Sequence, residues 1–199
     1  MNMNMTHPNP VLSAIFQRRS IRKYTDQPVE PEKLELLLQA AMAAPSAMNS
    51  KPWEFVVITD STKLAQCRKR LIFGNRNAPA AILVCGNPEA SANRVAKNFW
   101  VQDCSAAIEN ILVAAIGLGL ATVWIGIHPV KRFERTMREI AGLPESVTPL
   151  GMVYVGYGAE EKESRSQYDA ERVHWQVYSP HNVELEPSAE TTSPTTIKE

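Results

Sequence analysis

The chain lacks an excess of charge, since its 21 basic and 21 acidic residues leave a formal net charge of zero over 199 residues. A balanced total argues against bulk nucleic-acid binding, which needs a basic face, and against a polybasic membrane-surface role. Cysteine is scarce too: the three present have long spacings that fit neither a disulfide framework nor a zinc pattern. We expect reduced, buried thiols in a cytoplasmic protein. Residues 1–10 show no secretory signal.

Several catalytic and membrane signatures are also missing. The four histidines are scattered without metal-ligand spacing, and neither a Gly-x-Ser-x-Gly elbow nor a phosphate-binding loop occurs. We therefore predict no metal and no catalytic triad, with His128 before Pro129 as a turn residue. The apolar stretch 106–127 is long enough for a membrane span. However, Glu109 and Asn110 within it favour a buried core helix that runs into a strand.

The sequence instead contains an interleaved series of helix and strand patterns. Apolar residues at helical spacing, with start and stop signals, predict helices at 10–17, 31–44, 61–72, 95–118 and 130–141. Short apolar runs predict strands at 53–58, 80–85, 122–127 and 150–157. This order favours an α/β or α+β sandwich around one central sheet. We assign residues 1–183 to one domain and the polar residues 184–199 to a disordered tail.

A short cationic segment follows the first predicted helix. It contains Arg18, Arg19, Ser20 and Arg22 within five residues. Guanidinium groups form forked, charge-assisted hydrogen bonds with phosphate oxygens, and a serine hydroxyl can complete such a cradle. Taken alone, the segment is better explained as a solvated basic turn after a helix than as a phosphate site.

Two further segments favour a ligand site over a solvated turn. The loop 45–52 is bracketed by prolines, which restrict it, and its Ser46, Asn49 and Ser50 supply neutral donors and acceptors suited to the edge of a flavin or nicotinamide ring. The stretch 117–126 carries three glycines that permit close backbone approach to a flat ligand. It is no Rossmann fingerprint, because its Gly-x-Gly pair ends a helix. A helix-stop turn and simple packing are the alternative interpretations.

In their order and spacing, these segments resemble the nitroreductase family of flavin mononucleotide (FMN) enzymes over residues 11–175. The resemblance extends to residues 149–158 and to Arg165 as a C-terminal phosphate contact. It implies no catalytic side chain, because the cofactor performs the redox step. The FMN-binding residues that it implies are Arg18, Arg19, Ser20, Arg22, Pro45, Ser46, Ala47, Met48, Asn49, Lys51, Ile125, Gly126 and Arg165.

The resemblance also implies an architecture and a reaction. The expected fold is an α+β, nitroreductase-like three-layer sandwich, with a central, mostly antiparallel sheet flanked by helices. The long buried helix 95–118 would lie at a homodimer interface, where two flavins bind and the loop 45–52 comes from the partner chain. The expected chemistry is ping-pong hydride transfer from NADH or NADPH to nitroaromatic, quinone or similar small acceptors.

Two positions depart from the family pattern. Lys51 stands where glutamine is frequent, and we hypothesise that it raises the reduction potential of the flavin. Gln167 stands where many members have a second basic residue, which would weaken phosphate binding.

Other functions stay open at this point. One is a different flavin reaction on the same scaffold, such as reductive dehalogenation or flavin breakdown, although residues 61–92 leave little length for the lid of those branches. A second is a non-catalytic flavin carrier. A third is RNA binding through residues 18–23 and 68–70, which the neutral charge disfavours.

Overall fold

A computed structural model describes residues 7–71, 76–164 and 166–178. The chain divides into two compact units, residues 1–165 and 166–199. The described part of the second unit contains a short 3-10 turn, η4 (Ala170–Arg172). The expected phosphate contact Arg165 and the expected tail 184–199 lie outside the described residues, and the single domain 1–183 stays a prediction.

The centre of the first unit is a four-stranded sheet of order β1-β2-β4-β3, in which every neighbouring pair is antiparallel. Its strands are β1 (Trp53–Ile58), β2 (Ala80–Gly86), β3 (Ala121–Gly126) and β4 (Thr148–Gly156). All four predicted strands are confirmed within two residues at each end. β2 is buried along its whole length, which explains why its sequence is continuously apolar.

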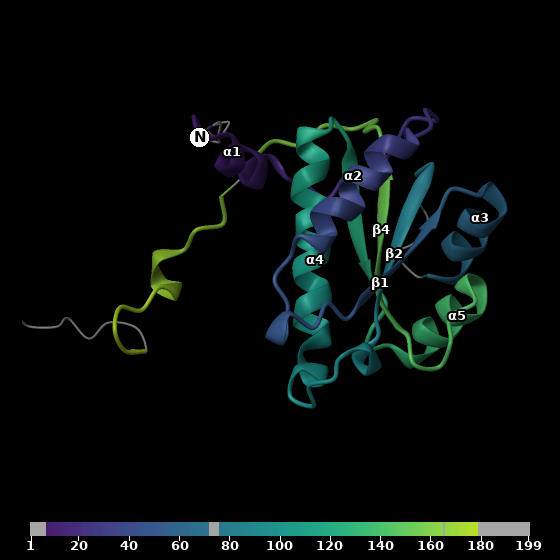
Figure 1. The fold of residues 1–199 in the computed structure, drawn as a ribbon. Coiled ribbons are helices and arrows are strands. Elements are labelled where there is room, and N and C mark those ends of the chain that lie inside the picture. The colour runs from purple at the N-terminus through teal and green to yellow at the C-terminus, as the bar shows by residue number, and fades with distance from the viewer. Residues whose placement is uncertain (1–6, 72–75, 165, 179–199) are drawn as a thin grey trace, which may run out of the picture. The chain divides into compact units, whose positions relative to one another are not determined.

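Helices cover both faces of this sheet (Figure 1). Alternate residues of β2 pack in opposite directions, as the two-residue period of a strand requires. Ile82 and Val84 join the core beneath α2 (Pro31–Met42) and α4 (Trp100–Gly117). Leu83 and Cys85 join the core beneath α3 (Ser61–Arg70) and α5 (Lys131–Ala141). The expected α+β three-layer sandwich is confirmed.

Local signals fix where several helices begin and end. The Asn9 side chain accepts from two backbone N–H groups of α1 (Pro10–Gln17), and Asp60 accepts from the Lys63 N–H at the start of α3. Pro31 opens α2. Gly142 ends α5 in the left-handed conformation, at φ 67°.

The long helix differs from its prediction at the start. Residues Ala96–Phe99 form a 3-10 helix, η3, and α4 begins only at Trp100. The combined stretch Ala96–Gly117 is long and apolar enough, by length and composition alone, to cross a membrane. The core helix of a globular fold passes the same test, and α4 buries Cys104, Ile108 and further residues in the core against the sheet. We therefore treat α4 as a core helix.

The three cysteines are free and buried, as the sequence predicts. Burial raises the pKa of the Cys85 and Cys104 thiols to about 12. Thiols with so high a pKa stay protonated at neutral pH and act as small apolar side chains.

Candidate functional site

The cationic segment lies along the outer edge of the sheet, beside β3. Ser20 forms an isolated parallel bridge with Thr122, and the Ile21 N–H donates to the Thr122 carbonyl over 2.9 Å. Further along, the buried Tyr24 donates its hydroxyl to the Ile21 carbonyl over 2.7 Å. The segment is thus a fixed extension of the sheet edge.

The arginines of this segment have partners within the chain. The Arg18 Nε atom lies 3.3 Å from the Glu109 carboxylate of α4, and the two side chains are 33% and 52% exposed. The Arg19 guanidinium donates to the Glu163 carbonyl. An ion pair this exposed contributes about 0–1 kcal/mol, so Arg18 can exchange Glu109 for another anion at little cost.

Arg22 and Ser20 belong to a second small network. The Arg22 side chain donates to the Ser20 carbonyl over 3.3 Å, and its backbone N–H donates to the Glu160 carboxylate over 2.6 Å. Lys162 also donates to the Ser20 carbonyl, over 2.7 Å. Sequence reasoning did not identify Lys162, because a lone lysine in a polar stretch carries no local signal.

A cavity of about 210 Å³ opens beside the same sheet edge. It brings together three of the residues implied by the resemblance, Arg22, Ile125 and Gly126, although more than 100 residues separate Arg22 from the other two. Sequence reasoning missed three residues of this cavity: Val123, Trp124 and Arg76, the last from a segment (72–77) to which it gave no role. The cavity is lined by Arg22, Arg76, Val123, Trp124, Ile125 and Gly126.

The backbone of β3 is open along this edge. The Ile127 N–H donates inward to the Leu150 carbonyl, whereas the Thr122 carbonyl points outward to Ile21. Because alternate residues of a strand point the same way, Trp124 and Gly126 direct their backbone groups toward the open edge. A Cβ added to Gly126 would meet nothing within 4 Å, so packing within the chain does not explain why this residue is glycine.

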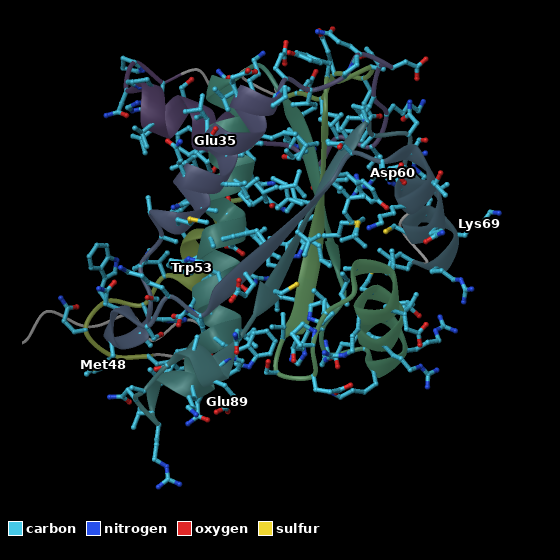
Figure 2. The ribbon with its side chains drawn as sticks, turned by 45° about the vertical axis from the view of Figure 1, so that its right-hand side comes forward. Glu35, Met48, Trp53, Asp60, Lys69 and Glu89 are labelled. Atoms are coloured by element: carbon cyan, nitrogen blue, oxygen red, sulfur yellow. The ribbon has the colours of Figure 1, made fainter. Side chains whose placement is uncertain are left out.

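The loop 45–52 has an unusual backbone. Met48, Asn49 and Lys51 have φ values of 52°, 54° and 50°, in the left-handed region that residues other than glycine rarely adopt. The Lys51 N–H donates to the Ser46 hydroxyl over 3.0 Å and so closes the turn. Figure 2 shows Met48 at the outer end of this loop, and its side chain is 75% exposed. Strained backbone conformations of this kind are concentrated at functional sites.

A buried carboxylate holds the loop against α4. Asp103, only 5% exposed, accepts the Ala47 N–H at 2.9 Å through Oδ1. At the end of the loop, the Asn87 N–H donates to the Pro52 carbonyl over 2.6 Å. Three buried side-chain atoms around the loop have no hydrogen-bond partner: Ser50 Oγ, Asn87 Oδ1 and Asp103 Oδ2. Such atoms are uncommon in native proteins, so this loop combines strain with unsatisfied polar groups.

The loop and the cationic segment attach to different parts of α4. Their anchors, Asp103 and Glu109, are six residues apart in the sequence, which is about 9 Å along a helix and about 120° around it. In Figure 1 the loop lies near the lower end of α4 and α1 near its upper end. The residues that line the cavity include none from 45–52.

His128 has a more specific role than that of an ordinary turn residue. Its Nδ1 lies 2.8 Å from Glu134, whose second oxygen is 3.0 Å from Lys131 Nζ, and its ring packs edge-on against Trp100. Burial opposes ionisation of Glu134, but hydrogen bonds from Lys131 and His128 outweigh it and lower the pKa of this carboxyl. These contacts fix the turn between β3 and α5.

Comparisons with known proteins agree with this architecture. Residues 15–74 and 73–157 match the model of the nitroreductase family. A protein of Archaeoglobus fulgidus, provisionally named NADH dehydrogenase/NAD(P)H nitroreductase, is 42% identical over 82% of this chain and 95% of its own length.

Two solved structures are similar as well. One, from Bacteroides thetaiotaomicron, has the same provisional name and superimposes with a TM-score of 0.81 at 37% identity over 86% of this chain and 100% of its own. An FMN-dependent nitroreductase from Clostridium difficile gives a TM-score of 0.75 at 33% identity, over 84% of this chain and 99% of its own.

Proposed function

We propose that this chain, which belongs to the nitroreductase family, is an FMN-dependent oxidoreductase. When bound, FMN supplies the chemistry that moves a hydride from NADH or NADPH to a small nitroaromatic, quinone or similar acceptor. The observation that carries the proposal is the cavity at the open edge of β3, with Arg22 beside the backbone of Gly126. The buried, free thiols are in keeping with a cytoplasmic location.

The residues at this edge suit the cofactor. Arg22 offers a guanidinium group to a phosphate or to a ring oxygen. The outward backbone of Trp124 and Gly126 can donate hydrogen bonds to a flat ring, and the missing side chain at Gly126 lets that ring come close. Fixed donors of this kind stabilise negative charge that develops during reduction. Arg18 and Arg19 are the proposed phosphate ligands, with Arg165 as a third.

We further propose a homodimer in which the loop 45–52 of one subunit completes the site of the other. A cavity of about 210 Å³ is smaller than the roughly 300–1,000 Å³ of ordinary ligand sites. The loop is anchored elsewhere on α4, and its Met48 is exposed. In addition, α1 has no buried residue, and its Val11, Leu12 and Ile15 are exposed. A helix whose apolar side chains are exposed in the single chain favours a protein–protein interface.

The first test is a visible absorption spectrum of the purified protein after FMN is added and the excess removed, followed by anaerobic NADH and then NADPH. We expect a bound oxidised-flavin spectrum that bleaches with at least one nucleotide. A retained flavin that neither nucleotide bleaches would support the carrier alternative. If no flavin is retained, the proposed cofactor is wrong.

A second assay separates reactions on the same scaffold. Turnover with nitroaromatics is expected to exceed turnover with halogenated phenols. The opposite order would favour reductive dehalogenation.

A further inference from the structure

A hollow of about 400 Å³ lies between α3 and α5, on the sheet face opposite α2 and α4. It is lined by Lys69, Arg70, Arg132, Arg135 and Thr136, and we call it the basic hollow. Figure 2 shows Lys69 projecting outward from α3. None of these residues lines the cavity at the β3 edge, so the basic hollow is separate from the proposed flavin site.

Basic residues outnumber acidic ones on the two helices that form the basic hollow. α3 carries four basic residues and no acidic one, and α5 carries four basic residues and two acidic ones. Of the latter two, Glu134 is already bound to Lys131 and His128. In the described parts of the chain, no ion pair involves any of the four cations. The protein is neutral overall, so this concentration is local.

Fold stability does not account for all of these charges. Lys69 and Arg70 lie in the last turn of α3, where the helix dipole favours cations. Arg132 lies in the first turn of α5, where the dipole disfavours them. Arg132 and Arg135 are three residues apart on α5, and like charges at such spacing destabilise a helix by about 0.2–0.5 kcal/mol. Arg132 also lies over the Phe133 ring, 5.1 Å from its centroid, but no such contact accompanies Lys69, Arg70 or Arg135 in the described parts of the chain.

We propose that the basic hollow binds a small molecule that carries two or more linked phosphate groups. Forked guanidinium groups from Arg132 and Arg135 match phosphate oxygens, and a single phosphate cannot neutralise four cations. The Thr136 hydroxyl donates to the Arg132 carbonyl, so the cations supply the donors to the ligand. The volume suits a small ligand, whereas a nucleic acid needs an extended basic face.

Inorganic tripolyphosphate is the probe, titrated calorimetrically into protein saturated with FMN at constant ionic strength. We expect saturable binding, with orthophosphate at least tenfold weaker. The double variant Arg132→Gln/Arg135→Gln should weaken tripolyphosphate binding at least tenfold. Lys63→Gln is the control for charge removal elsewhere, because it removes one exposed cation from α3 outside the basic hollow, and it should change affinity less than twofold.

The folding of the double variant is checked by its melting temperature without ligand, which should stay close to that of the original protein because relieved repulsion offsets the lost contact of Arg132 with the Phe133 ring. No saturable binding of tripolyphosphate, or binding that the double variant retains, would overturn the proposal. Tighter binding of a 20-nucleotide RNA than of tripolyphosphate, lost in the double variant, would overturn it in favour of a polymer-binding surface. None of these outcomes depends on flavin reduction.

Discussion

Two carboxylates on α4 hold the two halves of the candidate site, and they do so differently. Asp103 is 5% exposed and accepts the Ala47 N–H of the loop 45–52 at 2.9 Å. Glu109 has a side chain 52% exposed and lies 3.3 Å from Arg18 of the cationic segment. The first contact fixes a strained loop in one conformation. The second leaves an arginine free to change partners.

The buried contact of Asp103 should also contribute more free energy than the exposed contact of Glu109. Removing the acceptor of a buried hydrogen bond costs about 1–3 kcal/mol, because the donor stays unsatisfied. An exposed ion pair contributes about 0–1 kcal/mol and is screened by salt. Asp103 also lies in the first turn of α4, where the helix dipole favours its negative charge. The loop is therefore preorganised, whereas Arg18 is adjustable.

The strongest test of this comparison is Asp103→Ala. Without its acceptor, the loop should lose its left-handed conformation at Met48 and Asn49. We expect FMN affinity, measured by fluorescence titration, to fall between tenfold and a hundredfold, which corresponds to about 1.4–2.8 kcal/mol. Asp103→Asn is the control, since its amide oxygen can still accept the Ala47 N–H, and it should recover most of the affinity. Equal losses in both variants would contradict a hydrogen-bonding role.

The next largest effect is expected at Gly126, where the two anchored halves are proposed to meet the ring. A valine here finds open space within the chain, so the fold should tolerate it, while FMN affinity should fall about tenfold, or about 1.4 kcal/mol. Gly86→Ala is the contrasting variant, because its Cβ would come within 2.1 Å of Trp100, which does not line the cavity. It should lower the melting temperature instead. Unchanged flavin binding in Gly126→Val would move the site away from this edge.

The sequence predicted the elements of the fold well and the anchors of the site poorly. Apolar runs such as 80–85 and helix signals such as Pro31 and Asp60 are local, and the structure confirms them. The contact between Ala47 and Asp103 joins residues 56 positions apart. Nothing in the local sequence marks an aspartate inside an apolar helix as a loop anchor. Such pairings are products of tertiary packing.

The cavity residues that sequence reasoning missed at the sheet edge also lack a local sequence signal. Trp124 and Arg76 line the cavity, but a tryptophan in a strand is ordinary core composition, and an isolated arginine is usually solvated. The cationic segment was visible in the sequence because its charges are adjacent. Its attachment to Thr122 depends on strand pairing that a single sequence does not reveal.

A smaller effect is expected at Lys51, an exposed member of the fixed loop with φ at 50°. If the preorganised loop presents this ammonium group to the ring, Lys51→Gln should lower the midpoint potential of bound FMN by about 15 mV, equivalent to about 0.7 kcal/mol for two electrons. Lys51→Arg, which keeps the charge, should stay near the original value. A potential that does not change in Lys51→Gln would rule out an electrostatic role.

The smallest effect is expected for Glu109→Gln, and its direction separates an adjustable contact from a fixed one. Removing the carboxylate releases Arg18, so FMN affinity should rise by up to about twofold at low salt and stay unchanged at high salt, where the original pair is already screened. The free energy of unfolding should fall by no more than about 1 kcal/mol. Arg18→Gln should have the opposite effect. It removes the proposed phosphate contact, so FMN affinity should fall at both salt concentrations. If Glu109→Gln instead weakens FMN binding tenfold, then Glu109 is a fixed anchor like Asp103, and exposure does not distinguish the two carboxylates.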